Sequence, residues 1–237
     1  MQILRDLYQV GGDLNGITFD QQGALWNDGN SYVLSTKKGL ILFDCGCGET
    51  LEQIFDNIKY WGLDPHNITH CILTHPHLDH AGAGHRLSAM GVKLWAITET
   101  AQAVASGDER CCGYLYHKKF IPFQLNRELT DQEIFLLHDI EFEVMHLPGH
   151  SMGCTAYFFE WEGRKIVISG DVIGTLLSGD FGWSGSIDFN KEHYINSLLK
   201  FSKRDTDLML PGHGLIYFHK PRIRVEEALN AALMQWR

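Results

Sequence analysis

The chain has 237 residues, of which 44% are hydrophobic and 21% charged, and its formal net charge at pH 7 is -9. This composition is that of an ordinary globular protein and excludes the disordered and fibrous classes. The negative balance argues against a protein that works by neutralising a phosphate backbone, so we expect a small-molecule substrate and no nucleic-acid partner.

The N-terminal residues show no basic segment followed by an apolar one, and no apolar run approaches the ~20 residues that span a membrane. We therefore expect a cytoplasmic protein without a membrane partner. The cysteines lie mostly inside apolar segments or beside glycine, and we expect reduced thiols. They are Cys45, Cys47, Cys71, Cys111, Cys112 and Cys154.

The first half of the chain alternates predicted strands with predicted helices. Two apolar β-forming runs joined by a turn at Gly39 predict a hairpin, and apolar residues at helical spacing predict a helix that Gly62 ends. Such alternation implies a sheet covered by helices. The expected elements are strands over 31–36, 40–44, 68–74 and 92–97 and helices over 49–61, 81–90 and 98–105.

Between residues 106 and 127 the periodicity lapses and aromatic and basic residues accumulate. Loops on a rigid scaffold often carry substrate contacts, so Tyr114, Tyr116 and His117 are candidates for lining a pocket. A dimer contact or a mobile loop explains the segment equally well. The protein is therefore a possible homodimer.

Strand signals return in the second half, followed by two helices. No linker rich in proline, glycine or serine separates the halves, so we expect a single domain over residues 1–237. The expected elements are strands over 134–137, 140–147, 155–161, 165–169 and 207–210 and helices over 190–201 and 221–236.

A cluster of metal-ligand residue types follows the predicted strand at 68–74. His75, His77, Asp79 and His80 stand within six positions. Imidazole and carboxylate are ligands that zinc prefers, and a polar surface turn is a poor explanation of such density. If the chain stays extended, His75 and His77 fall on the same side, because side chains alternate along a strand. Asp79 and His80 lie past the strand end, point in another direction and suit a second ion.

Four further ligand-type residues stand at the ends of apolar strands. Asp44 ends a buried strand, where its carboxylate needs either a histidine N–H or a backbone N–H of the histidine turn; capping its own turn is an equal alternative. The other three each lie beside glycine, which lets the backbone turn sharply near a metal. They are His150, Asp171 and His213.

Together these segments resemble the pattern of the metallo-β-lactamase superfamily, from about residue 31 to His213. The resemblance implies an α+β fold, a four-layer αββα sandwich with a two-metal site at one edge. It suggests that Asp171 bridges the two ions and that Asp44 supports the ligands. It also suggests one ion on His75, His77 and His150 and the other on Asp79, His80 and His213.

The physical chemistry agrees with this assignment. Two zinc ions about 3.5 to 4 Å apart can share a water whose pKa falls to about 7, which supplies a hydroxide nucleophile at neutral pH. Asp79 is then both a ligand and the residue that orients the bridging hydroxide. We expect a dinuclear zinc hydrolase, with iron or manganese as alternative metals.

Within the superfamily, the chain is similar to the glyoxalase II and lactonase branch. Exported β-lactamases commonly lack the full ligand set, which argues against antibiotic hydrolysis. Glyoxalase II enzymes bind glutathione with a helical C-terminal extension, and only 24 residues follow His213, which argues against that thioester. The expected reaction is hydrolysis of a small ester, thioester or lactone, with Trp183 at the pocket mouth or simply packed.

Three alternatives remain open. The segment 149–154 is similar to that of persulfide dioxygenases, which use a single iron on the first ligand set. A phosphodiesterase acting on RNA or a small phosphodiester shares the scaffold. A metal-dependent binding protein without catalysis is the third alternative, although two-metal sites normally create nucleophiles.

Overall fold

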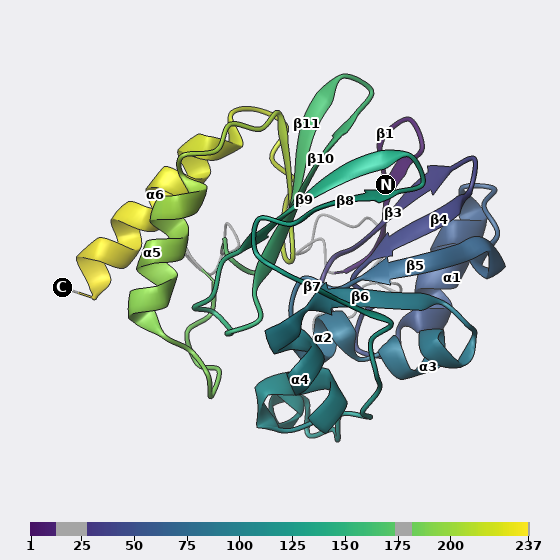
Figure 1. Cartoon of the computed structure of the whole chain (residues 1–237), viewed down its shortest axis with the longest axis horizontal. Helices are drawn as coiled ribbons and strands as arrows, with labels where there is room; N and C mark the ends of the chain where they lie inside the picture. The colour runs from purple at the N-terminus through teal and green to yellow at the C-terminus, as the bar shows by residue number, and fades with distance from the viewer. Residues whose placement is uncertain (13–27, 174–181, 237) are drawn as a thin grey trace. The chain divides into compact units, whose positions relative to one another are not determined.

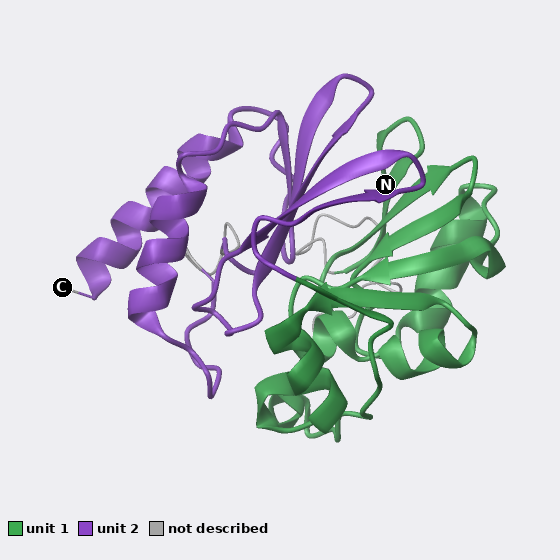
Figure 2. Ribbon diagram, in the orientation of Figure 1, with its two compact units in different colours: residues 1–129 green, residues 130–237 purple. Residues whose placement is uncertain are grey.

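The computed structural model describes residues 1–12, 28–173 and 182–236. The chain forms two compact units, Met1–Leu129 (unit 1) and Thr130–Arg237 (unit 2), which are coloured separately in Figure 2. Each unit contains one sheet with helices, the components of the predicted sandwich. The expectation of a single domain over residues 1–237 stays a prediction.

Unit 1 is built on a mixed seven-stranded sheet in the order β1-β2-β3-β4-β5-β6-β7 (Figure 1). The strands from β1 to β4 pair antiparallel, and those from β4 to β7 pair parallel. Carboxyl ends of parallel strands meet at one sheet edge, so the residues after β4 and β5 lie together. The strands are β1 (Gln2–Leu4), β2 (Leu7–Gly11), β3 (Ser31–Thr36), β4 (Gly39–Phe43), β5 (Ile68–Ile72), β6 (Lys93–Ile97) and β7 (Arg127–Leu129).

The helices of unit 1 bury apolar stripes in one core with the sheet. Leu51, Ile54 and Ile58 of α1 recur at helical spacing and share a buried cluster with Val33 and Leu42. The helices are α1 (Leu51–Tyr60), α2 (Leu78–Ala81), α3 (Gly84–Ala89) and α4 (Thr98–Ser106), with 3-10 turns η1 (Pro65–Asn67), η2 (Glu109–Cys111) and η3 (Gly113–Tyr116).

Unit 2 contains a five-stranded sheet in the order β12-β11-β10-β9-β8, and only β11 and β12 run parallel. Two helices lie side by side and share a buried core with the sheet (Figure 1). The elements are β8 (Ile134–Leu137), β9 (Ile140–His146), β10 (Thr155–Trp161), β11 (Arg164–Gly170), α5 (Lys191–Phe201), β12 (Leu208–Pro211) and α6 (Pro221–Gln235).

Most predicted elements are present, with informative differences. The helix predicted over 81–90 is shorter, covering Gly84–Ala89, and a separate short helix, Leu78–Ala81, precedes it. The two are separated because Ala83 donates its N–H to the Gly46 carbonyl, at 3.2 Å, and a Cβ on Gly82 would meet the backbone of Cys47. The strand predicted over 68–74 ends at Ile72, since the Thr74 N–H donates to the Asp44 carboxylate instead of to a neighbouring strand. Strands β1, β2 and β7 were not expected, and β1 and β7 have three residues each.

All six cysteines are free and buried in the structure, and their reduced state stays a prediction. No helix in the described ranges is both long and apolar enough to cross a membrane.

Candidate metal centre

The histidine cluster of unit 1 occupies the turn between β5 and α2. His77 keeps an extended backbone as the N-cap of α2, and Asp79 and His80 lie inside that helix. The His75 ring is 4.5 Å from the His77 ring and 4.1 Å from the His80 ring, centroid to centroid. The predicted closeness of His75 and His77 is present, but His80 does not point away from this pair, because the helix brings it back toward His75.

Asp44 holds this turn from the end of β4. Its Oδ1 accepts the Thr74 N–H at 2.7 Å, and its Oδ2 lies 2.7 Å from the Thr74 hydroxyl and 2.8 Å from His80 Nδ1. The carboxylate thus has both kinds of partner considered from the sequence. Its φ of 55° is unusual for a non-glycine residue and aims the side chain back at the turn.

These contacts determine which nitrogens of two histidines carry a proton. An ionised carboxylate only accepts, so His80 donates Nδ1–H to Asp44 and keeps a lone pair on Nε2. The Thr74 hydroxyl donates its one hydrogen to Asp44, so it can only accept a hydrogen bond from His75 Nδ1, which lies 3.0 Å away. His75 therefore also carries its proton on Nδ1. Both rings are in the tautomer that offers Nε2 to a metal.

The residues of unit 1 fit a divalent metal by the chemistry of their donors. Three imidazoles and one carboxylate are gathered on one short turn, and all four side chains are buried. Within the described residues the Nε2 atoms of His75 and His77 are buried and make no hydrogen bond, although both rings have other contacts. Nitrogen and oxygen donors of this kind suit zinc, iron or manganese.

The segment beginning at Asp28 makes hydrogen bonds to the loop after β4 and to α2, a role that was not predicted from the sequence. Asp28 Oδ1 accepts the Cys47 N–H at 2.6 Å, and burial raises the pKa of Asp28 to about 6, although hydrogen bonds from Thr50 and Cys47 oppose the rise. Gly29 donates its N–H to the Asp79 carbonyl at 3.0 Å. A Cβ on Gly29 would lie 2.4 Å from the His80 ring, so only glycine fits there.

Unit 2 gathers its three donors from three strand ends. His150 follows β9, Asp171 follows β11 and His213 follows β12. Asp171 Oδ2 is 3.5 Å from His150 Nε2 and 3.4 Å from His213 Nε2. The parallel pairing of β11 with β12 explains why Asp171 and His213 lie close together. The Gly212 N–H continues this pairing by donating to the Gly170 carbonyl at 2.8 Å. The Nε2 atoms of His150 and His213 therefore both face one oxygen of Asp171.

His150 is oriented by a backbone carbonyl. Its Nδ1 lies 2.7 Å from the Trp183 carbonyl oxygen, which can only accept, so Nδ1 carries the proton and Nε2 is the available donor. Ser186 donates its hydroxyl to the His150 carbonyl at 2.5 Å. The Trp183 side chain is 46% exposed, so the residue expected at a pocket mouth also supports a candidate ligand through its backbone.

The other predicted substrate residues lie in and after η3 of unit 1. Tyr114 is exposed, whereas Tyr116 is partly buried against the core of the unit. His117 ends η3 in a left-handed conformation, and an ion pair between Lys118 and Glu49 at 2.6 Å ties the segment to the loop before α1. Their role in binding substrate stays a prediction.

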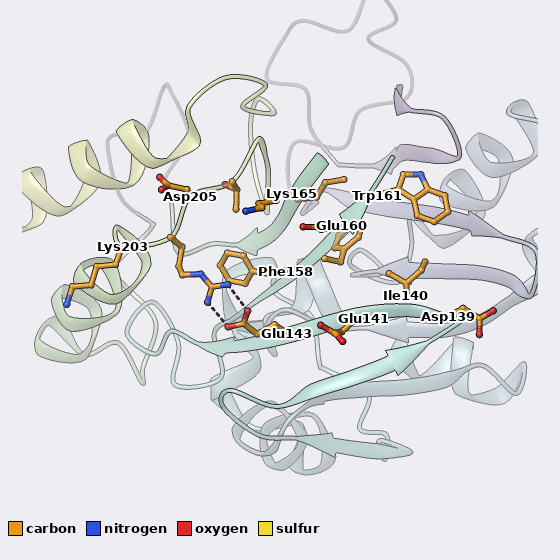
Figure 3. Close-up of a pocket in the computed structure, with 14 residues that line it drawn as sticks. Asp139, Ile140, Glu141, Glu143, Phe158, Glu160, Trp161, Lys165, Lys203 and Asp205 are labelled. Atoms are coloured by element: carbon orange, nitrogen blue, oxygen red, sulfur yellow. Dashed lines mark hydrogen bonds and ion pairs between the residues drawn. The ribbon is translucent and has the colours of Figure 1, made fainter. Parts of the chain in front are cut away.

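A separate hollow of about 760 Å³ in unit 2 contains none of these donors (Figure 3). Arg204 makes two contacts with the Glu143 carboxylate, at 2.5 and 2.6 Å, and its guanidinium lies 4.3 Å from the Phe158 ring centroid. The pair lowers the pKa of Glu143 and raises the pKa of Arg204. Two of the charged residues that line the hollow are therefore already engaged with each other in an ion pair.

Comparison with known proteins places the chain in a family. Residues 24–213 match the model of the metallo-beta-lactamase superfamily. The chain belongs to this superfamily. It is 30% identical over 191 residues to hydroxyacylglutathione hydrolase GloC of Haemophilus influenzae, a match that covers 78% of this chain and 84% of the relative.

Two further similarities bear on fold and activity. The chain is 26% identical over 188 residues to the atrochrysone carboxyl ACP thioesterase of Aspergillus fumigatus, covering 79% of this chain and 51% of that protein. A metallo-beta-lactamase of Cronobacter sakazakii superposes with a TM-score of 0.77 at 20% identity, covering 99% and 96% of the two chains. The predicted α+β fold of the metallo-β-lactamase type is confirmed, and the superfamily is one of metal-binding hydrolases.

Proposed function

We propose that the protein is a dinuclear zinc hydrolase that cleaves a small thioester. The observation that carries this proposal is the convergence of His150 and His213 on one oxygen of Asp171 within unit 2. A carboxylate that lies between two imidazole nitrogens supports a metal-ligand set, because buried carboxylates are either paired or bound to metal and these three groups are ligand types that zinc prefers. The family pattern supports two ions, with iron or manganese as alternatives to zinc.

The ligand assignment rests on the family pattern and is carried forward as part of the proposal. Each ion is assigned three ligands of its own, and Asp171 is proposed to bind both ions. The first set is His75, His77 and His150, and the second is Asp79, His80 and His213.

The residues of the chain contribute orientation and proton placement. Bound metal ions supply an activated water and polarise the carbonyl oxygen of the substrate. Asp44 and Thr74 hold His80 and His75 with their protons on Nδ1, and the Trp183 carbonyl does the same for His150. Asp79 is proposed to orient the attacking water as well as to bind metal. No serine or cysteine nucleophile is required.

A thioester is favoured over an ester or a lactone by the names of two relatives. One is a hydroxyacylglutathione hydrolase and the other a thioesterase. The match to the Haemophilus protein covers 84% of that protein, so the argument against a glutathione thioester from the length after His213 loses its force. Hydroxyacyl thioesters of glutathione therefore belong among the first substrates to test.

The test is a substrate panel run on protein of measured metal content. Zinc-loaded protein should hydrolyse a thioester faster than a lactone or a phosphodiester, and chelation should abolish the reaction. Oxygen consumption with a persulfide on iron-loaded protein would replace the proposal with a dioxygenase. Preferential phosphodiester cleavage would make it a phosphodiesterase, and loaded protein without turnover on any of these would indicate a binding protein.

A further inference from the structure

Tyr194 of α5 joins two segments of unit 2, one that carries the candidate ligand Asp171 and one that supplies the carbonyl that orients His150. The side chain is fully buried, and its hydroxyl donates to the Val172 carbonyl at 2.6 Å and accepts the Gly182 N–H at 2.5 Å. Val172 directly follows Asp171, and Gly182 directly precedes Trp183. One hydroxyl group is therefore shared by positions that lie ten residues apart.

Each of these segments supplies one side of the His150 site. Asp171 provides the carboxylate 3.5 Å from His150 Nε2, and Trp183 provides the carbonyl 2.7 Å from His150 Nδ1. The imidazole is thus held between two groups on opposite sides of its ring. A change in the separation of Val172 and Gly182 would change the position of both groups relative to the ring.

Close packing supports the same conclusion. A Cβ on Gly182 would lie 2.1 Å from the Asp171 carbonyl oxygen, so the two segments are in direct contact. A Cβ on Gly149 would lie 2.3 Å from the Cβ of Tyr194, and the φ of Gly149 is 146°, a value that favours glycine. The residue before His150 therefore rests on the tyrosine that binds the other two segments.

The hydroxyl is suited to a permanent structural role. Burial raises the pKa of Tyr194 well above its usual range, so the group stays protonated and can donate and accept at once. The ring packs against Phe189 and Trp236, with centroid distances of 6.1 and 5.8 Å. These contacts hold the ring without the hydroxyl, so the two functions of the side chain can be separated by substitution.

We infer that Tyr194 is a positioning residue for metal binding, which fixes Asp171 and the Trp183 carbonyl at the spacing that His150 requires. It touches neither substrate nor metal and acts through Val172 and Gly182. The inference rests on the proposed metal site but not on the proposed thioester substrate.

The test compares Tyr194→Phe with Phe201→Leu. Tyr194→Phe removes only the hydroxyl and should weaken zinc binding about tenfold, near the lower limit for partners of metal ligands, because it acts through one further contact. Phe201 lies on the same helix, is buried and contacts Phe158 at 6.0 Å between centroids. Phe201→Leu should lower stability at least as much and leave zinc affinity unchanged.

Zinc affinity is measured by competition with a chelator, and the coordination geometry by the visible spectrum of the cobalt-substituted protein. Tyr194→Phe should change that spectrum, and Phe201→Leu should not. Hydrogen exchange of the wild-type protein adds a test that needs no variant, since the Gly182 amide should exchange slowly.

Wild-type zinc affinity and cobalt spectrum in Tyr194→Phe, or rapid exchange at Gly182 in the wild type, would overturn the inference. Equal weakening of zinc binding by Phe201→Leu would also overturn it, because the effect would then be general destabilisation. Zinc binding without thioester hydrolysis would overturn the proposed function alone.

Discussion

The two units supply candidate metal donors in different ways. In unit 1 four donors stand within six positions, and one carboxylate and one hydroxyl connect two of the rings. In unit 2 three donors come from three strand ends, and the segments around His150 and Asp171 are connected through the Tyr194 hydroxyl of α5. A contiguous turn is organised by a shared side-chain network, whereas donors distant in sequence depend on the sheet and α5.

This difference predicts how many donors a single substitution should disturb. A change in the shared network of unit 1 should disturb several donors together, and its effects should not be additive with those of its neighbours. A change at a loop contact of unit 2 that does not involve Tyr194 should remain local. Five substitutions test this comparison, in order of decreasing expected effect.

Asp79→Ala should lower kcat/KM by about 100-fold or more, because loss of a ligand should exceed the about 10- to 100-fold cost of losing a ligand's partner. The fold should remain largely intact, as judged by circular dichroism. Asp56→Ala on α1, an exposed carboxylate paired with Lys59, is the control and should keep full activity. Near-normal turnover in Asp79→Ala would remove Asp79 from the mechanism.

Asp44→Asn should weaken zinc binding about 10- to 100-fold, since an amide cannot accept from Thr74 and His80 as the carboxylate does. The measurement is chelator competition. Asp64→Asn makes the same change at an exposed residue that caps η1, and it should leave zinc affinity at the wild-type value. Equal affinities in both variants would show that the carboxylate of Asp44 does not orient a ligand.

Thr74→Val should weaken zinc binding less than Asp44→Asn and should lower the free energy of unfolding by about 1–3 kcal/mol, because it leaves a buried donor unsatisfied at His75. Thr74→Ser should restore both quantities. The double variant of Asp44→Asn and Thr74→Val should lose less affinity than the sum of the single losses, because both act on one network. Full additivity would contradict a shared network.

Ser197→Ala should have a smaller effect, confined to one loop of unit 2. The hydroxyl donates to the Pro148 carbonyl at 2.7 Å, and its loss should lower the free energy of unfolding by about 1 kcal/mol. Its effect on zinc affinity should add to that of Asp44→Asn within about 0.5 kcal/mol. Strong coupling between these two changes, measured in a double-mutant cycle, would mean that the supports are not separate.

Glu143→Gln should have the smallest effect and should leave zinc binding unchanged. The ion pair with Arg204 is partly exposed, so its contribution at pH 7 is about 0.5–1 kcal/mol after solvent screening. Arg204 lowers the pKa of Glu143, so this stability is present above the ordinary glutamate pKa of about 4.3 and is lost as pH falls through the lower folded value. Urea unfolding should therefore show the variant approaching the wild type below about pH 4; a constant difference would contradict the linkage.

Much of the candidate site could be predicted from residue types and their positions. His150, Asp171 and His213 each follow an apolar strand and stand beside glycine, and this pattern can be read from the sequence alone. The partners of these donors were harder to predict. The Trp183 carbonyl leaves no mark in the sequence because every residue has one, and Tyr194 has the appearance of an ordinary core residue on an amphipathic helix.

The segment at Asp28 was missed for a related reason. Asp28 and Gly29 read as a polar turn, and nothing in the sequence shows that the carboxylate is buried and that the glycine lies against the His80 ring. The substrate roles of Tyr114, Tyr116, His117 and Trp183, the cytoplasmic location and the possible homodimer stay predictions.

The sequence by itself determined the donor types, their order and the α+β fold, because ligand chemistry and strand periodicity are properties of neighbouring residues. Only the tertiary structure decided how the donors are held. It showed the link from Asp44 through Thr74 to His75 and the hydroxyl of Tyr194 between two segments. Most of these hydrogen bonds join residues 12 or more positions apart in the chain, and their geometry exists only once the strands have paired.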